Sequence, residues 1–514
     1  MRLFDYLDKG ASIDPKAPCL TTDGDTLSYA QVQATSREIA AGLAARRVKP
    51  GDKVAIISGN DPTAFTCVFG ISRVGAVWCP INPRNEAQEN RELLELSDCK
   101  VVIFANAYTE LVDRIRADLP MVHTWVCLDA QPEGAFSWGE FLEAGGEWQA
   151  SGAPVGDLAM VVGTGGTTGR PKGVMLSNRN LETMTALTLM SYPFTKTPVY
   201  LAMAPLTHAA GVLCFPILAL GGEIVIMRGA DVGAFLDNVE EYGVTHSFLP
   251  PTIVYMILAE TGLDSTDLSS LECLWYGAAP MSPVRLEEAI KRIGPVMAQL
   301  FGQTEAPMMI STMAPRDHFL PDGSLADSRL SSAGRPTPLC TVEVMSPEGE
   351  ILARGERGEI VVRGSLVMDG YYKNPEATEE ATRFGWHHTG DIGYLDEDNY
   401  LYVVDRAKDM IITGGFNVYS TEVEQALLSH PDVQDCAVIG LPDEHWGEMV
   451  TAVVQLRRGG AVTTEELRGH VKSRIGSVKT PKRIDAWSDL PRSKVGKVLK
   501  VEIRKELLED ETSM

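Results

Sequence analysis

Short apolar runs alternate with longer amphipathic stretches through most of the N-terminal part of the chain. The runs expected to form strands are 53–58, 76–81, 100–104 and 158–162, and later 223–227, 245–249, 271–276 and 296–301. Helical periodicity predicts helices at 29–45, 63–74, 86–97, 232–242, 251–261 and 283–293. Strands separated by helices of this length favour parallel sheets. The pattern therefore predicts two α/β units.

The pattern changes in the C-terminal part of the chain. From Ala333 to Val404, short alternating strands are separated by glycine and Pro-Glu-Gly turns, which predicts a small antiparallel β unit. A separate α+β domain is expected after it. Thr421 with Glu424, and Thr463 with Glu466, have the spacing of a capping box, so each pair predicts the start of a helix. The apolar strands expected in this domain are 436–441 and 449–456.

Composition excludes several classes of protein. The chain has 514 residues, too many for one compact core, and 44% of them are hydrophobic and 22% charged, as in ordinary globular proteins. Its 46 basic and 69 acidic residues give a net charge of −23, which argues against a nucleic-acid partner but leaves room for a nucleotide. Nine cysteines without a C-x-x-C pair predict reduced thiols and a cytoplasmic location. The acidic N-terminus gives no sign of an export signal.

One apolar stretch, Tyr200 to Met227, is long enough to span a bilayer and has no Lys, Arg or Asp. However, prolines and glycines, Pro205, Gly211 and Pro216 among them, divide it into short pieces. We therefore expect a buried strand, loop and helix here, and no membrane span.

A glycine-rich run, T-G-G-T-T-G-R-P-K-G, extends from Thr164 to Gly173, directly after the expected strand 158–162. Glycines allow backbone N–H groups to approach phosphate oxygens, while the threonine hydroxyls add donors and Lys172 adds charge. The run matches neither the Walker spacing nor the dinucleotide fingerprint. Its place at the C-terminal end of a strand favours a polyphosphate cradle, and a plain hairpin turn is the alternative.

Four further clusters carry polar groups, and each could also be an ordinary turn, junction or linker. They are F-G-Q-T-E-A at 301–306, W-H-H-T-G-D at 386–391, D-R-A-K-D-M-I-I-T-G-G-F-N at 405–417 and P-R-S-K-V-G-K at 491–497. Two more short motifs are A-P-L-T-H at 204–208 and Y-G-A-A-P at 276–280. Their joint order is far more specific than any one of them.

In this order, and over nearly the whole chain, the motifs resemble the adenylate-forming superfamily of acyl-CoA synthetases, luciferases and peptide-synthetase adenylation domains. The resemblance implies an α/β N-terminal domain of two α/β subdomains plus a β-barrel, residues 1–404. It also implies a hinge at 405–408 and a small mobile α+β lid domain at 409–514. The implied reaction has two steps: a carboxylate attacks the α-phosphorus of ATP, pyrophosphate leaves, and a thiol then takes the acyl group from the acyl-adenylate. ATP, Mg²⁺ and coenzyme A are the implied cofactors, with a small-molecule carboxylic acid as the partner.

The resemblance also implies a nucleotide site. Lys172 would hold the β and γ phosphates with a loop of six residues, and Thr304 would hold the α-phosphate. Asp391 and Arg406 would contact the ribose, while Thr168 and Glu305 would hold Mg²⁺. The six loop residues are Thr164, Gly165, Gly166, Thr167, Thr168 and Gly169. The residues expected to flank the adenine are Ala278, Ala279 and Phe301, and Gly302 and Gln303 are also expected to bind the nucleotide.

Two lysines match the family's mobile parts. Lys497 corresponds to the catalytic lysine that reaches the carboxylate and the α-phosphate, and Lys408 corresponds to the hinge position. Rotation about Lys408 would withdraw Lys497 and bring in the thiol channel, formed by Gly414, Gly415, Phe416 and Asn417. His208 would lie between the acid and nucleotide pockets, with a buried structural histidine as the alternative. The implied catalytic set is Lys497, Thr304, Glu305, Lys172 and His208.

Three positions depart from the family's usual pattern: Phe301 stands for Tyr, Gly165 for Ser, and Ser420, a potential helix cap, for Pro. None removes a charged role. The expected acid pocket is mostly apolar, which favours a hydrophobic acid over a polar amino acid. Its residues are His208, Thr252, Ile253, Met256, Gly277, Gly302, Pro307 and Met308.

Alternative functions are an acyl-AMP ligase that loads a carrier protein, a luciferase-like oxygenase and a non-catalytic nucleotide or acyl-ligand binding protein. The sequence leaves open which acid is used and whether the chain forms a homo-oligomer.

Overall fold

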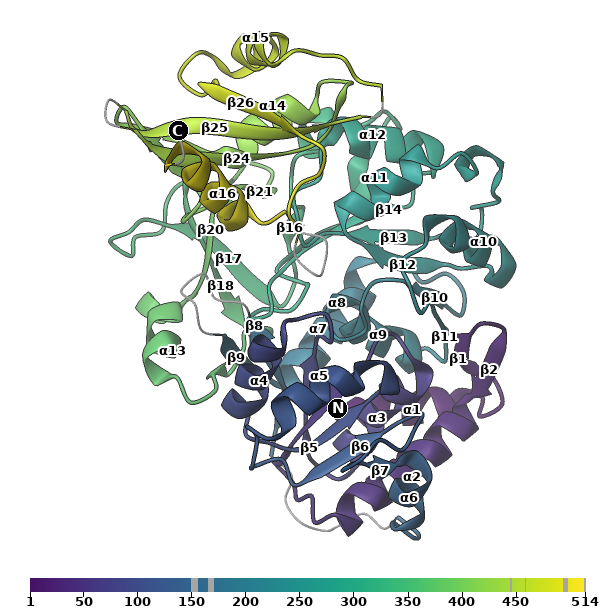
Figure 1. Ribbon diagram of the computed structural model, residues 1–514. Helices are drawn as coiled ribbons and strands as arrows, with labels where there is room; N and C mark the ends of the chain where they lie inside the picture. The colour runs from purple at the N-terminus through teal and green to yellow at the C-terminus, as the bar shows by residue number, and fades with distance from the viewer. Residues whose placement is uncertain (149–155, 165–170, 444–445, 458, 493–497, 513–514) are drawn as a thin grey trace.

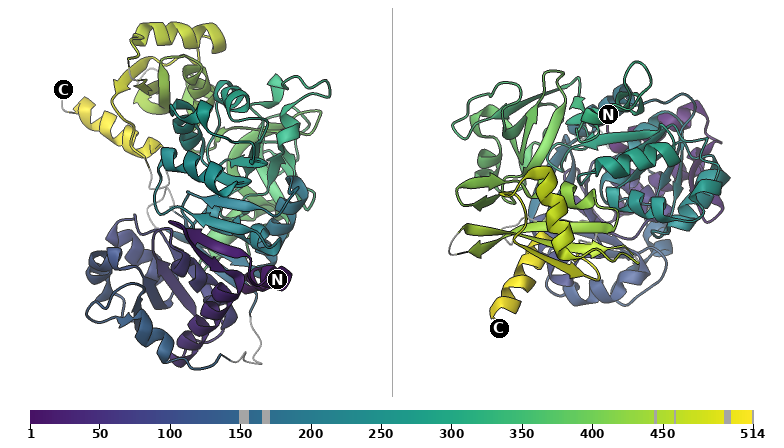
Figure 2. Two further views of the ribbon diagram at one scale, coloured as in Figure 1. Left: turned by 90° about the vertical axis from the view of Figure 1, so that its right-hand side faces the viewer. Right: turned by 90° about the horizontal axis from the view of Figure 1, so that it is seen from above.

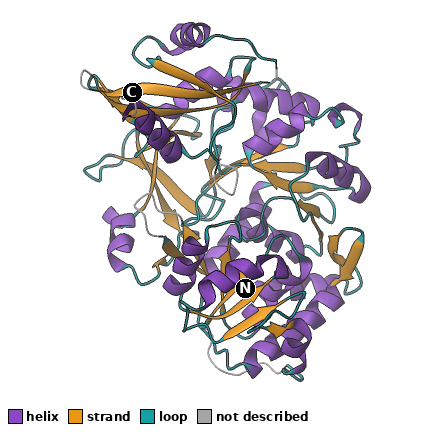
Figure 3. Ribbon diagram, viewed as in Figure 1, coloured by secondary structure: helices purple, strands orange, loops and turns teal. Residues whose placement is uncertain are grey.

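Across the residues that the structure describes, the chain forms four β-sheets, and helices pack on and between them (Figures 1 and 3). The structure is a computed structural model that describes residues 1–148, 156–164, 171–443, 446–457, 459–492 and 498–512. An eight-stranded and a nine-stranded sheet make up the two predicted α/β units, a four-stranded sheet lies beside them, and a five-stranded sheet forms the C-terminal part. The large N-terminal and small C-terminal parts confirm the expected α/β architecture.

The eight-stranded sheet has the order β19-β9-β8-β4-β3-β5-β6-β7 and is parallel from β8 to β7. All of its strands predicted from the sequence are present. Their bounds are β3 Lys53–Ile57, β4 Val77–Ile81, β5 Cys99–Phe104, β6 Thr124–Cys127, β7 Phe136–Ser137, β8 Leu158–Thr164, β9 Lys172–Ser177 and β19 Gly370–Tyr371. The predicted helices are α2 Tyr29–Ala45, α3 Pro62–Arg73 and α4 Ala87–Leu96.

The glycine-rich run does not lead from a strand to a helix. Instead, β8 and β9 are antiparallel, with Thr164 opposite Lys172, so the run connects the two strands of a hairpin. The hairpin alternative was therefore right about the local topology, while the predicted position at the end of β8 is also confirmed. Residues 165–170 lie outside the described residues.

The nine-stranded sheet has the order β16-β15-β14-β13-β12-β10-β11-β1-β2. The N-terminal hairpin of β1 and β2 joins it because β1 pairs in parallel with β11, a long-range contact that periodicity could not indicate. The strands are β1 Pro18–Thr22, β2 Asp25–Ser28, β10 Val199–Ala202, β11 Glu223–Ile226, β12 His246–Leu249, β13 Cys273–Tyr276, β14 Met297–Phe301, β15 Ser311–Met313 and β16 Arg335–Pro336. The predicted helices are α10 Val232–Tyr242, α11 Pro251–Ala259 and α12 Pro283–Arg292.

Helix α1 (Leu3–Ile13) packs on both α3 and α9 (Cys214–Ala219), and the three helices share one hydrophobic core with strands of both large sheets. The apolar stretch 200–227 lies in this region as strand, loop and short helices, as expected. In the part of the chain that the structure describes, no helix is long and apolar enough to cross a membrane. The nine cysteines are all free and eight of them are buried, which agrees with their predicted role as small core residues.

The small β unit, expected as a barrel, has four antiparallel strands in the order β17-β18-β20-β21, so β17 and β21 are its edges. Its last strand ends at Arg406, which pairs with Asp391 across the sheet. The strands are β17 Cys340–Met345, β18 Gly358–Gly364, β20 His387–Leu395 and β21 Leu401–Arg406.

The C-terminal part is an α+β unit at the top of Figure 1, and Figure 2 shows α16 on its outer side. The Thr463 capping box is present, since Thr463 and Glu466 bond to each other's backbone at the start of α15. The strands are β22 Ile411–Thr413, β23 Phe416–Val418, β24 Val433–Asp443, β25 Gly447–Leu456 and β26 Arg483–Trp487. The helices are α14 Ser420–Leu428, α15 Thr464–Ile475 and α16 Lys500–Thr512.

The capping box predicted for Thr421 and Glu424 is wrong, because α14 begins at Ser420, two residues before the start that a cap at Thr421 would give. The carboxylate of Asp405 accepts hydrogen bonds from the backbone N–H of Ser420, its hydroxyl (3.0 Å) and the hydroxyl of Thr421 (3.4 Å). Ser420 is therefore not the cap either. An acceptor distant in sequence satisfies the start of this helix.

Glu424 points inward and forms an ion pair with Lys500 at 2.8 Å, with 14% and 21% of the two side chains exposed. Lys500 also donates to the Ser420 hydroxyl at 2.6 Å. Burial raises the pKa of Glu424. Although burial alone would lower it, the nearby Glu424 and Asp405 hold the pKa of Lys500 above its ordinary value. The ammonium group thus offsets two carboxylates at the junction of β21 and the C-terminal unit.

We predict that Lys500→Met destabilises the C-terminal unit by about 2 kcal/mol or more, because a largely buried carboxylate loses its counter-ion. Denaturant unfolding followed by tryptophan fluorescence would measure the change. Lys291→Met is the matched control, since its pair with Glu287 is exposed on a helix surface and should contribute about 0.5 kcal/mol or less. Equal losses in the two variants would contradict the prediction.

His246 is buried in the nine-stranded sheet. Its ring stacks on Phe194 with centroids 4.5 Å apart and lies 5.1 Å from the ring of Trp275, and its Nε2 is 2.9 Å from the carbonyl oxygen of Pro193. Burial lowers the pKa of His246 from 6.5 to about 4. The folded protein therefore holds this imidazole neutral.

Below pH 6.5 the unfolded chain binds a proton at His246 that the folded chain does not bind until pH falls to about 4. Stability should therefore fall as pH falls through this window, by about 1.4 kcal/mol per pH unit from this group. His246→Gln should reduce the slope of unfolding free energy against pH in this window relative to the wild type. An unchanged slope in His246→Gln would refute the assignment.

Candidate active site

The residues predicted to bind the phosphates come from two different sheets. Some belong to the glycine-rich hairpin and the others to the loop after β14. Thr164 ends β8 and Lys172 begins β9, and the Thr164 hydroxyl donates to the Lys172 carbonyl at 3.3 Å. The loop that contains Thr304 and Glu305 follows β14 of the nine-stranded sheet. The structure describes Thr164, Lys172, Thr304 and Glu305. Gly165, Gly166, Thr167, Thr168 and Gly169, together with Lys497, lie outside the described residues.

Tyr371 connects the two sets of groups. Its hydroxyl donates to Glu305 Oε1 at 2.9 Å, and Lys172 Nζ lies 4.8 Å from the centre of its ring. The backbone N–H of Met368 also donates to the Glu305 carbonyl at 2.8 Å. Burial raises the pKa of Tyr371, so its hydroxyl remains a donor at neutral pH. Sequence reasoning missed this residue, and only the aromatic G-Y-Y run at 370–372 could have drawn attention to it.

Gln303 connects the same loop to Asp391, a residue predicted to bind the ribose. Its amide nitrogen donates to the carbonyl of Thr389 at 2.7 Å and to Asp391 Oδ2 at 3.1 Å. Its amide oxygen lies 3.1 Å from His387 Nε2. Asp391 is buried and pairs with Arg406, with Oδ1 to Nε at 2.9 Å. The structure thus brings Gln303, Asp391 and Arg406 together, as the sequence suggested, and adds His387, whose pKa is lowered by burial.

Two glycines expected in the acid pocket, Gly277 and Gly302, are explained by close backbone packing. A side chain at Gly277 would approach the Leu300 carbonyl oxygen to 2.4 Å, and one at Gly302 would approach the Met308 backbone nitrogen to 2.4 Å. Both glycines are therefore required by close backbone packing, whatever the ligand. Ala278 and Met308 have positive φ values of 67° and 62°, which marks the turns beside β13 and β14 as constrained.

The other expected pocket residues lie on separate elements of the nine-stranded region. Thr252, Ile253 and Met256 lie on α11, with Met256 51% exposed, and His208 directly precedes α8 (Ala209–Val212). Pro307 is buried, and Phe301 is half-buried at the end of β14. Ala279 is half-buried in the turn after β13, next to the exposed Ala278.

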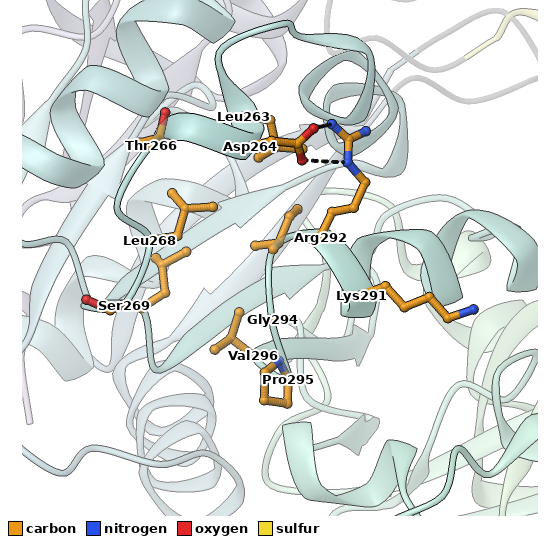
Figure 4. A pocket seen from close by; sticks show the side chains of 12 residues that line it. Leu263, Asp264, Thr266, Leu268, Ser269, Lys291, Arg292, Gly294, Pro295 and Val296 are labelled. Atoms are coloured by element: carbon orange, nitrogen blue, oxygen red, sulfur yellow. Dashed lines mark hydrogen bonds and ion pairs between the residues drawn. The ribbon is translucent and has the colours of Figure 1, made fainter.

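A surface pocket of about 600 Å³ lies elsewhere, between the loop at 263–271 and the end of α12 (Figure 4). Asp264 and Arg292 form a two-pronged ion pair beside it, with both bonds 3.0 Å long. None of the predicted site residues lines this pocket. It is therefore not the expected acid pocket.

The expected thiol channel lies in the β22–β23 hairpin of the C-terminal unit. Gly414 and Gly415 both have positive φ, 56° and 81°, and the N–H of Gly414 donates to the Trp446 carbonyl at 2.8 Å. A side chain at Gly414 would lie 2.9 Å from the Trp446 ring, so this position requires glycine twice over. Phe416 and Asn417 are exposed. Burial lowers the pKa of Lys408 in the preceding segment.

The carboxylate of Glu305 suits magnesium better than a transition metal. Among the residues that the structure describes, no three His, Cys, Asp or Glu side chains are grouped to hold a metal ion. A single carboxylate beside a phosphate site fits Mg²⁺, which is held in proteins by one or two carboxylates together with substrate phosphates. Thr168, the other expected ligand, lies outside the described residues.

Two family models match the chain: one described as AMP-binding enzyme, over residues 7–372, and one described as AMP-binding enzyme C-terminal domain, over residues 422–497. The chain belongs to the AMP-binding enzyme family. This is the adenylate-forming superfamily that the motifs resembled.

Individual relatives agree with this membership. A medium/long-chain-fatty-acid–CoA ligase, FadD8 of Mycobacterium tuberculosis, is 42% identical over 348 residues, which are 66% of this chain and 60% of that protein. A feruloyl-CoA synthase from an Amycolatopsis species is 37% identical, covering 96% of this chain and 97% of that protein. The solved structure of amide bond synthetase McbA from Marinactinospora thermotolerans has a TM-score of 0.87 at 30% identity, covering 98% and 99% of the two chains. This AMP-binding enzyme is thus an AMP-forming acid–CoA ligase, of a family that uses ATP and CoA.

In this AMP-binding enzyme, we predict that Gln303→Leu weakens ATP binding about tenfold, because a hydrogen bond to a charged group contributes on the order of 1.5–3 kcal/mol. Without the amide, Asp391 loses one of the groups that orient it. Calorimetric titration with ATP would measure the dissociation constant. Gln88→Leu, on the exposed face of α4, removes a similar bond to Glu92 and should leave ATP binding unchanged. Equal affinity in Gln303→Leu and wild type would contradict the prediction.

Proposed function

We propose that this ligase activates a hydrophobic carboxylic acid with ATP and transfers the acyl group from the adenylate to CoA. The observation that carries the proposal is that one loop, the loop after β14, contacts both the residues expected to bind the phosphates and those expected to bind the ribose. Through Glu305 it meets Tyr371 beside Lys172, and through Gln303 it meets Asp391 beside Arg406. One ATP molecule laid along this loop would have its phosphates near Lys172 and its ribose near Asp391.

The first step needs positive charge around the α-phosphorus. The acid's carboxylate oxygen forms a bond to that phosphorus while the bond to the pyrophosphate oxygen breaks, so negative charge builds on the phosphate oxygens. Thr304 and Lys497 would stabilise this charge more strongly in the transition state than in bound ATP, while Lys172 would hold the β and γ phosphates that leave as pyrophosphate. Asp391 would accept hydrogen bonds from the ribose hydroxyls and fix the nucleotide. Glu305 and Thr168 would hold Mg²⁺, which would supply positive charge to offset the negative charge of the phosphates.

Apolar groups on α11 support a hydrophobic acid. Ile253 and Met256 present apolar side chains, and the expected pocket residues include no carboxylate that could pair with the ammonium group of an amino acid. Relatives named for fatty and ferulic acids fit this choice.

The second step would use the small C-terminal domain. We place the large domain at 1–404, the hinge at 405–408 and the lid domain at 409–514, with Lys408 as the pivot. Rotation would exchange Lys497 for the hairpin that contains Gly414, Gly415, Phe416 and Asn417, where the thiol sulfur of CoA attacks the acyl carbonyl and AMP leaves. The exposed Phe416 is available to a ligand on this face.

Acid-dependent exchange of pyrophosphate into ATP tests the first step. A panel of fatty, aryl and polycyclic acids should include at least one that drives exchange, and the same acid should then give a thioester with free CoA. No exchange with any acid would overturn the proposal. Exchange without a CoA thioester would assign the acceptor to a carrier-protein thiol or an amine, as in the amide bond synthetase.

We predict that Lys497→Ala lowers adenylate formation by about a hundredfold or more while sparing thioester formation from pre-made acyl-adenylate, since only the first step uses this charge. Single-turnover assays of the two half-reactions would measure both rates. Lys494→Ala, on the same segment of sequence, is the control and should change neither. Equal loss in both half-reactions would contradict the exchange of lid faces.

A further inference from the structure

A single buried tyrosine contacts both the phosphate-binding lysine and the magnesium-binding carboxylate of the proposed site. Tyr371 is 9% exposed, its ring faces Lys172 Nζ at 4.8 Å, and its hydroxyl donates to Glu305 Oε1 at 2.9 Å. A cation over an aromatic face and a hydroxyl bonded to a carboxylate are both favourable contacts. One side chain therefore satisfies two opposite charges from two different sheets.

The backbone around Tyr371 fixes its place between the sheets. β19 pairs with β9 so that Tyr371 lies opposite Val174, and the N–H of Tyr372 donates to the Gly173 carbonyl at 2.7 Å. Met368, at the other end of the segment, donates to the Glu305 carbonyl at 2.8 Å. The ring is thus tied to the strand that carries Lys172, while its segment is tied to the loop that carries Glu305.

Lys172 and Glu305 do not pair with each other directly, within the part of the chain that the structure describes. The neighbouring Tyr372 shows the other arrangement. Its hydroxyl donates to Asp98 at 2.9 Å and its ring lies 5.6 Å from Lys373 Nζ, but there Lys373 and Asp98 form an ion pair at 2.6 Å. A tyrosine thus meets a carboxylate and a lysine at both places: at Tyr372 the carboxylate of Asp98 pairs with Lys373, although Lys53 also lies over the ring at 4.7 Å, and at Tyr371 the two charges are held apart.

We infer that Tyr371 is a positioning residue that keeps Lys172 and Glu305 apart and oriented, so that each charge serves ATP: Lys172 its phosphates and Glu305 its Mg²⁺. This rests on the proposed function for the identity of the ligand. A directly paired lysine and carboxylate would neutralise each other, and ATP would have to break that pair in order to bind. The hydroxyl bond orients Glu305 and leaves its second oxygen for the metal ion.

Titration calorimetry with ATP, in the presence of Mg²⁺ and in the presence of EDTA, tests the inference without any acid or CoA. Tyr371→Phe loses the bond to Glu305 but keeps the ring under Lys172. It should bind ATP with Mg²⁺ about tenfold more weakly, as expected for a lost bond to a charged group, and bind ATP with EDTA like the wild type. Tyr371→Leu loses both contacts and should weaken binding under both conditions.

Tyr372→Phe is the matched control, because it removes an equivalent hydroxyl bond one residue away and should change neither titration. In pyrophosphate exchange, Tyr371→Phe should raise the Mg²⁺ concentration for half-maximal rate and keep the rate at saturating Mg²⁺ near wild type. The inference is overturned if Tyr371→Phe binds like wild type with Mg²⁺, if it weakens equally with EDTA, or if the wild-type protein shows no Mg²⁺-dependent gain in ATP affinity.

The proposed function can fail separately. A wild-type protein that exchanges pyrophosphate with no acid would refute the proposed reaction, while a Mg²⁺-specific loss of ATP binding in Tyr371→Phe would still support the role of Tyr371. Conversely, normal exchange and identical Mg²⁺ dependence in both proteins would leave the reaction standing and remove Tyr371 from it.

Discussion

A site for a polyphosphate has to gather charges of both signs without letting them neutralise one another. This constraint governs the arrangement around the loop after β14. Lys172 lies on the eight-stranded sheet, and Glu305 lies in a loop that follows a strand of the nine-stranded sheet. The buried Tyr371 contacts both, with its ring facing Lys172 and its hydroxyl bonded to Glu305. The side of the site proposed for the ribose has the same character, because Asp391 is buried but bonded on one oxygen to Gln303 and on the other to Arg406. In a low-dielectric interior such charges are costly unless every one has a partner, which explains why hydrogen-bonding side chains surround them.

The fold supplies these partners because several sheets meet near one loop. Strand β9 of the β8–β9 hairpin pairs with segment 368–372. This segment in turn bonds to the loop after β14. From the same loop, the amide of Gln303 reaches β20 of the small β unit. Each element is held by backbone pairing with its own sheet. The positions of the polar side chains are therefore fixed by rigid strands, and the loops only need to extend a few residues beyond them.

Much of the fold was readable from sequence because its signals are local. The bounds predicted for α2 and α10 match the structure, and eight strands of the two large sheets were found from their apolar runs, although the fully buried β6 was not. The errors concern contacts between distant residues. The pairing of β1 with β11, the acceptor that starts α14 and the bond from Tyr371 to Glu305 join residues far apart in the chain, and no local pattern announces them. For the same reason, motif order could suggest Lys172, Glu305 and Asp391 as site residues, while the tyrosine and the histidine that contact their neighbours needed the structure.

The helix start at Ser420 bears on how separable the C-terminal part is. Its acceptor, Asp405, is a residue of β21 and belongs to the sheet of the small β unit, whereas Ser420, Glu424 and Lys500 belong to the C-terminal unit. A fragment cut at residue 409 would lose that acceptor and leave the first turn of α14 without it. Exchange of this unit between related enzymes, by evolution or by engineering, would then need a crossover point before Asp405, so that the helix and its acceptor are inherited together.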